Sequence, residues 1–141
     1  MPNWCHNRVV ISHMKPQPIK ELVDIFQKDQ PFNALIPQPD WENLPNDRGE
    51  LPTIDKMGFL EFNGEQDMRW YHWRLANWGC KWDLNEGEVV MKLNKDKTIL
   101  QLWFETPWGP PDKIKEHIDS MDNFEIEWHW DEPGMADSGY L

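Results

Sequence analysis

The sequence predicts an α+β protein, a ferredoxin-like β-α-β-β-α-β sandwich with an inserted long loop and an extra helix between strand 1 and strand 2. Period-two alternation of apolar and polar residues indicates strands at both ends of the chain and in a hairpin between them. Amphipathic segments with helical spacing separate these strands. The 141 residues suit a single domain, 1–141.

The first strand is predicted over residues 4–12, where the alternation ends in a β-branched run. Prolines at 16 and 18 then open an amphipathic helix that ends near Gln30. Neither period lasts through residues 31–66, which hold five of the 12 prolines, so this insertion is expected to be irregular. Its apolar residues predict that it wraps around the domain.

The extra helix is predicted after Asp67, which is in position to cap it, and Gly79 supplies a left-handed stop. One apolar stripe is expected to bury this helix in the core: Met68, Tyr71, Leu75 and Trp78.

Two further strands, over residues 89–93 and 98–105, are joined by a charged turn and predict an antiparallel hairpin. Pro110 and Pro111 start another helix, and alternation from residue 124 to 131 predicts the last strand.

In this plan the sheet order is fourth, first, third and second strand. The start of the first strand then lies beside the ends of the third and fourth, and the second strand begins at the same edge. Four segments should therefore form one contiguous surface, the Trp-rich edge: residues 2–4, 77–83, 105–111 and 131–135.

The candidate binding residues all lie on this edge: Asn3, Trp4, Asn77, Lys81, Trp82, Asp83, Glu105, Trp108 and Glu132. Flat rings, one cation and several carboxylates are what a pocket for a small polar ligand or a peptide terminus would use. The alternative is structural, because the indoles would also close the open end of the sandwich. Trp78 is expected in the core and Trp108 at the surface.

On the sheet itself, His6, Arg8, Gln101 and Trp103 should share one face, opposite Cys5, Val9, Leu100 and Leu102. The polar face is a candidate surface for a homodimer, or for cover by the insertion. Cys5 and Cys80 are expected to be free thiols, with Cys5 in the core.

The formal net charge of -11 argues against general nucleic-acid binding. No apolar run is long enough for a membrane span. No spacing typical of a zinc site, a P-loop, a dinucleotide fold or a hydrolase elbow occurs, so no cofactor, metal or catalytic residue is expected.

Several stretches resemble the YubB-type ferredoxin-like family of plasmid, genomic-island and phage proteins: MPNWCHNRVVIS, FNALIPQP, WYHWRLANWGCKWD, FETPWGPP and EPGMADSGY. The resemblance implies a ferredoxin-like fold and a mobile-element origin, and no established activity.

Three hypotheses for function follow. The first is a non-catalytic accessory protein, cytoplasmic in a bacterial host, that binds a host protein or a small polar ligand at the Trp-rich edge. The alternative is a sequestering protein for a nucleotide-like signal, with Lys81, Arg74 or Arg69 near phosphate. The third is a metal-dependent hydrolase that uses carboxylates of the edge, Asp83, Glu105, Asp131 and Glu132.

Overall fold

The alternating residues near the N-terminus form the central strand of a five-stranded antiparallel sheet in the computed structural model, which describes residues 2–141. This strand, β1 (Trp4–Ser12), pairs with β6 (Ile99–Pro107) on one side and β7 (Glu125–Glu132) on the other. The outer strands are β5 (Val90–Leu93) and β8 (Asp137–Tyr140), which gives the order β5-β6-β1-β7-β8.

The two faces of this sheet differ as their period-two pattern predicts. Along β1 the side chains of Cys5, Val9 and Ile11 are buried, whereas His6 and Arg8 are exposed. On β6, Leu100 and Leu102 are buried, and Gln101 and Trp103 point to the other face with partial exposure. The predicted division of residues between the faces is therefore confirmed, including the position of Cys5 in the core.

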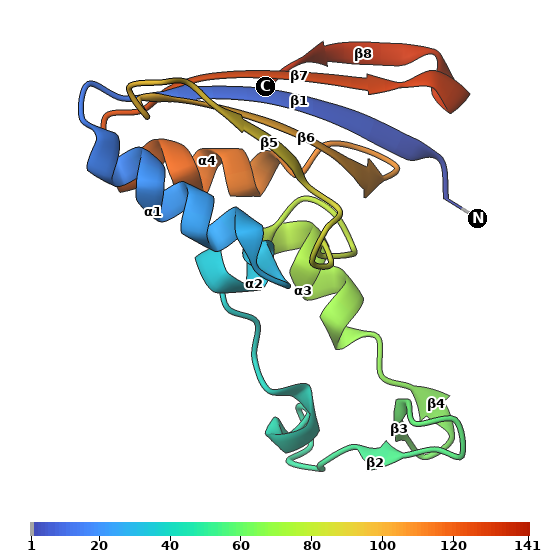
Figure 1. The fold of residues 1–141 in the computed structure, drawn as a ribbon. Coiled ribbons are helices and arrows are strands. Elements are labelled where there is room, and N and C mark those ends of the chain that lie inside the picture. The colour runs from blue at the N-terminus through green and yellow to red at the C-terminus, as the bar shows by residue number, and fades with distance from the viewer. Residues whose placement is uncertain (1) are drawn as a thin grey trace.

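Two helices cover the buried face: α1 (Pro16–Gln27) and α4 (Asp112–Met121) lie along the same side of the sheet (Figure 1). Their apolar stripes enter the core through Ile19, Leu22, Phe26, Ile114 and Ile118. Within residues 2–141 no helix covers the opposite face of the sheet (Figure 1).

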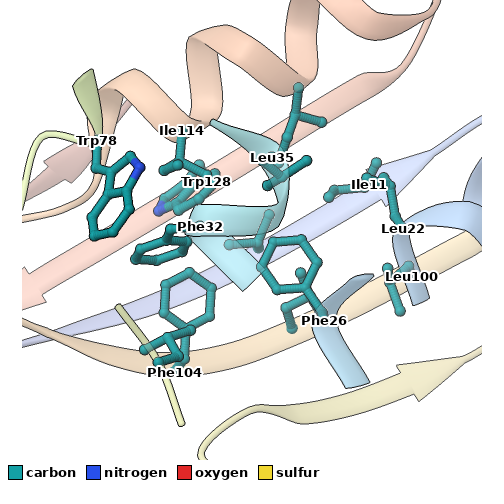
Figure 2. Close-up of a cluster of buried hydrophobic side chains, with 14 of the residues drawn as sticks. Ile11, Leu22, Phe26, Phe32, Leu35, Trp78, Leu100, Phe104, Ile114 and Trp128 are labelled. Carbon is teal, nitrogen blue, oxygen red and sulfur yellow. The ribbon is translucent and has the colours of Figure 1, made fainter. Parts of the chain in front are cut away.

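Large rings from distant parts of the chain meet at the centre of the core (Figure 2). Phe32 makes edge contacts with Trp78 and Phe104, at centroid distances of 6.0 and 6.1 Å. Phe104 in turn contacts Trp128 at 5.8 Å. Trp78 is fully buried, as the sequence predicted. Aromatic packing thus joins the sheet, the insertion and the end of the extra helix.

The insertion is more regular than the sequence predicted. Residues 31–66 contain α2 (Pro31–Leu35), the short 3₁₀ helix η1 (Trp41–Asn43) and a separate antiparallel sheet of three very short strands. These strands are β2 (Thr53–Ile54), β3 (Leu60–Phe62) and β4 (Glu65–Gln66).

Within residues 31–66, α2 and the adjoining Ile36 pack into the core, and the small sheet projects away from the main sheet (Figure 1). The expectation that the insertion wraps around the domain is therefore wrong. Apolar side chains near the tip are largely exposed, with Leu51 and Ile54 at 57% and Met57 at 81%.

The extra helix, α3 (Arg69–Asn77), is also less buried than its stripe predicted. Met68 and Leu75 are both 40% exposed, because most of α3 points toward the small sheet and lies beyond the reach of the main core (Figure 1). Its C-terminal end meets the core through Trp78. Gly79 has a φ of 91° and donates its N–H to the carbonyl of Arg74, so the predicted stop is confirmed.

The strand β8 has no counterpart in the sequence prediction, because its residues, Asp-Ser-Gly-Tyr, carry no apolar alternation. A 3₁₀ turn, η2 (Pro133–Met135), reverses the chain after β7 and places β8 on the edge of the sheet. In the described part of the chain, no helix combines the length and apolar composition that a bilayer span requires.

Candidate binding pocket at the Trp-rich edge

A pocket of about 360 Å³ opens at the Trp-rich edge. Four of the predicted binding residues line it: Trp4, Trp82, Asp83 and Glu105. The remaining lining residues were not among the nine predicted ones: Gln30, Arg74, Asn85, Glu88 and Pro107. The fold thus brings together the start of β1, the end of β6 and the segment that follows α3.

Two indoles form the apolar part of this pocket. Trp4 is the first residue of β1 and pairs with Pro107, and Trp82 lies just beyond the turn at Gly79. Their ring centroids are 6.1 Å apart and the planes are tilted by 42°. Trp4 remains 38% exposed and Trp82 39% exposed, so packing within the fold buries neither ring completely.

Arg74 supplies the cationic part of the pocket. Its guanidinium carbon lies 4.9 Å from the ring centroid of Trp70 and 5.2 Å from that of Trp78, so the group is held between aromatic rings. Nε donates to the side-chain oxygen of Gln38, and Nη1 donates to the carbonyl of Lys81, both at 3.1 Å.

The other terminal nitrogen of Arg74, Nη2, donates to no group among residues 2–141. No side-chain nitrogen or oxygen in the described chain is both buried and without a partner, so this Nη2 is accessible to solvent. Arg74 therefore has donor capacity left for a ligand. Burial lowers its pKa from the ordinary value, and the nearby carboxylate of Asp83 acts in the opposite direction.

Asp83 forms a wall of the pocket by holding the first turn of α2. Its Oδ1 accepts N–H groups from Phe32 and Leu84, and its Oδ2 accepts the N–H of Asn33 at 2.8 Å. Burial raises the pKa of Asp83, while these three hydrogen bonds and Arg74 lower it. Both oxygens already have partners, so Asp83 is a structural anchor as well as a lining residue.

Two glutamates complete the lining. Glu105 lies 2.8 Å from the Nδ1 of His6, and both side chains are about half exposed. Glu88 accepts the N–H of Asn85 at 3.0 Å through one oxygen only. No Lys or Arg among residues 2–141 forms an ion pair with either glutamate. In the described part of the chain, the pocket thus carries two carboxylates that no Lys or Arg side chain pairs with.

Lys81 does not line the pocket, although it contacts one of the lining rings. Its Nζ lies 4.4 Å from the ring centroid of Trp82, which is a cation–π distance. The predicted cation of the site is therefore placed beside the pocket, and Arg74 takes the position inside it.

The other predicted residues make structural contacts outside the pocket lining. The Asn3 carbonyl accepts the N–H of Trp108 at 2.7 Å, and the side chain of Trp108 is 54% exposed, as predicted. Asn77 donates to the carbonyl of Trp73 one turn earlier in α3. Glu132 is 1% exposed, and its carboxylate accepts two N–H groups of η2.

Among these further lining residues, the sequence predicted Arg74 only as a phosphate partner in the alternative hypothesis, and the others had weak signals. Arg74 precedes Trp78 by one helical turn, so it reaches the same end of α3. Glu88 and Asn85 lie in the turn before β5, at the edge where the second predicted strand begins. Among residues 2–141, no group of three or more His, Cys, Asp or Glu side chains is placed to hold a metal ion.

Comparison with known proteins places the chain near one family. Residues 77–141 match the sequence model of a family described as "Ferredoxin-like domain in Api92-like protein". A crystal structure of protein api92 from Yersinia pseudotuberculosis is similar over 99% of this chain and 93% of that chain, with a TM-score of 0.55 and 12% identity. No curated protein matches the chain. The likeness concerns the fold: mixed α/β, with antiparallel sheets and a ferredoxin-like domain.

Proposed function

We propose that this chain is a non-catalytic binding protein and that the pocket bounded by Trp4, Trp82, Arg74 and Glu105 is its contact site. One observation carries the proposal: two partly exposed indoles border a concave site that is also lined by Arg74, whose Nη2 donates to no group among residues 2–141. Trp and Arg are the side chains most enriched among residues that dominate binding energy.

The energetics of the isolated protein support this proposal. Trp4 and Trp82 each leave more than a third of their surface in water, and burying an aromatic ring is favourable by roughly 25 cal/mol per Å². A ligand that covers both rings recovers this free energy and also pairs with the Nη2 of Arg74. A structural plug would instead have buried the rings within the fold.

The biological setting remains part of the proposal. The resemblance of the quoted stretches to YubB-type proteins supports an accessory protein of a mobile genetic element, acting in the cytoplasm of a bacterial host on a host protein. The sheet order β5-β6-β1-β7 supports a β-α-β-β-α-β core into which residues 31–66 were inserted and to which β8 was added.

A nucleotide-like ligand is the second candidate. Stacking on the indoles and pairing with Arg74 favour it. Arg69, which the sequence offered as another phosphate partner, is fully engaged elsewhere: it pairs with Asp67 and donates to three backbone carbonyls of residues 41–45. Among residues 2–141, the second candidate therefore rests on one cationic side chain of the pocket lining, Arg74.

The test is affinity capture from a bacterial cytosolic extract with the immobilised chain, followed by mass spectrometry of retained proteins and small molecules. We expect a species that is retained by the wild type and lost by Trp4→Ala and by Trp82→Ala. Trp108→Ala is the matched control, because its indole is more exposed and does not line the pocket. Equal retention of every species by the pocket variants would refute the proposed site.

A further inference from the structure

The charge inside the pocket indicates which class of ligand it accepts. Among residues 2–141, its lining contains one cationic side chain, Arg74, and three carboxylates. Arg74 and Asp83 influence each other electrostatically and offset each other's charge. Glu88 and Glu105 remain, and His6 is the one ion-pair partner that either has among residues 2–141. An added positive charge is therefore favoured in this pocket.

The indoles favour the same kind of ligand. Aromatic faces attract ammonium and guanidinium groups that lie within about 6 Å of the ring centroid. Trp82 already holds one such group, because the Nζ of Lys81 lies 4.4 Å from its centroid. The ring of Trp4, tilted by 42° at 6.1 Å from Trp82, has no Lys or Arg over it in the described chain.

We propose that the pocket binds a basic side chain, Lys or Arg, presented by a partner protein. The charged head lies between Glu88 and Glu105, and the aliphatic stem lies against Trp4 and Trp82. The free Nη2 of Arg74 donates to a backbone carbonyl of the same partner segment. This inference rests on the proposed function, and it specifies what the contact site recognises.

The same arrangement disfavours a phosphate. A phosphate paired with Arg74 would lie in the same pocket as the carboxylates of Glu88 and Glu105, and these like charges would repel it. The net charge of -11 repels nucleotides and attracts basic protein surfaces on approach. The volume, about 360 Å³, is at the small end for ligand pockets and suits one side chain with its adjacent backbone.

The first experiment uses blocked tripeptides as probes, with acetylated N-termini and amidated C-termini. The sequences are Gly-Lys-Gly, Gly-Arg-Gly and a neutral control with norleucine at the centre, and AMP is the anionic probe. Indole N–H resonances of the ¹⁵N-labelled chain report binding, with Trp4 and Trp82 assigned by Trp→Phe variants. We expect the basic peptides to shift these two resonances and to leave that of Trp108 unchanged.

The second experiment removes one charge at a time. Glu105→Gln should weaken binding of the basic peptides by about twofold to fivefold, the range for an exposed charge pair. Glu127→Gln is the matched control, because it removes the same charge from the exposed sheet face outside the pocket. Added salt should weaken binding to the wild type more than to Glu105→Gln.

Three results would overturn the inference. One is equal binding of the norleucine peptide and the lysine peptide. Another is AMP binding that shifts Trp4 and Trp82 and tightens in Glu105→Gln, which would retain the pocket and reverse its charge preference. The last is no shift with either basic peptide at about 10 mM, a concentration that fills even a millimolar site. The affinity-capture experiment tests separately whether the pocket is the contact site, so the proposed function and the ligand class can fail independently.

Discussion

The indole N–H of Trp78 donates a hydrogen bond of 3.0 Å to the carbonyl oxygen of Ile36. This bond ties the end of α3 to the residue that follows α2. The ring itself has no exposed surface and contacts Phe32 (Figure 2). It also contacts Trp73, at a centroid distance of 5.7 Å. Trp78 therefore connects the insertion to the core. The pocket residues that flank Trp78 in the sequence depend on this contact for their position.

Replacing Trp78 should be far more damaging than replacing Trp108. Trp78→Ala is expected to cost roughly 3–5 kcal/mol of unfolding free energy, because it leaves a large cavity and an unpaired carbonyl. Trp108→Ala should cost about 1 kcal/mol or less, since that ring is more than half exposed. Urea denaturation followed by far-UV circular dichroism measures both. Equal loss in the two variants would show that the exposed ring is part of a structural plug.

Gly79 is expected to tolerate no side chain. Its φ is 91°, and a Cβ built there would lie 2.8 Å from the backbone nitrogen of Asp112 and still closer to its carboxylate. Gly87 is the matched control, with a φ of 88° and no atom within 4 Å of the added Cβ. Gly87→Ala should cost about 1 kcal/mol from backbone strain alone.

Gly79→Ala should exceed that cost, because the N-terminus of α4 must also move. Thermal melts of the two variants give the comparison. Equal melting temperatures would contradict the close approach of Gly79 and Asp112.

The two cysteines should be unreactive in the folded protein. Burial raises the pKa of Cys5 to about 11 and that of Cys80 to about 12, and the two side chains are 0% and 1% exposed. The thiolate is the reactive form, so a thiol reagent such as dithionitrobenzoate at pH about 8 should label neither until urea is added. Rapid labelling of either thiol without denaturant would contradict the described core.

These shifts also set the direction of an alkaline effect. Above the ordinary thiol pKa of 9.0 the unfolded chain loses its thiol protons while the folded chain keeps them. Stability should therefore fall as the pH rises from about 9 toward 11. The fall should be smaller in a Cys5→Ala, Cys80→Ala double variant, which has no thiols to titrate.

The sequence predicted those features that depend on local period and residue type. Alternation in β1 and β6 was sufficient to assign Cys5 to the core and His6 to the opposite face. The positions of Trp78 and Gly79 also followed from helix spacing and the left-handed stop.

Burial and contacts that depend on which distant segment packs against a residue could not be predicted from the sequence. Leu75 has the right spacing for a buried stripe, yet α3 extends past the sheet and leaves it 40% exposed. Glu132 looked like a site carboxylate at a strand end, but two N–H groups of η2 occupy it. Arg74 and Glu88 enter the pocket because the chain brings α3 and the turn before β5 together, and no motif marks that contact.

Arg69 should stabilise the local structure of the insertion and contribute little to the stability of the main fold. Its guanidinium binds Asp67 and donates to the carbonyls of Trp41, Leu44 and Pro45. Lysine cannot reproduce this fork of donors. Arg69→Lys should therefore speed cleavage within residues 44–66 by thermolysin, a protease that cuts beside apolar residues such as those exposed at this tip.

The same substitution should lower the global unfolding free energy by about 1 kcal/mol or less, because the small sheet lies apart from the main core (Figure 1). Arg48→Lys is the control, since no hydrogen bond or ion pair of that side chain is present among residues 2–141. Cleavage at the same rate in the two variants would show that the insertion is held by other contacts.

Acid should make the insertion of the wild-type protein easier to cleave, as the Arg69→Lys substitution does. The pKa of Asp67 is lowered, chiefly by its hydrogen bonds from the Arg69 side chain. A carboxyl with a depressed folded pKa stabilises the fold above the ordinary aspartate value, about 3.9, and loses that contribution as the pH falls through the folded pKa. An acid-stable protease, pepsin, should therefore cut the insertion of the wild type faster as the pH drops below about 4. The insertion of Arg69→Lys, already released, should show a weaker dependence on pH.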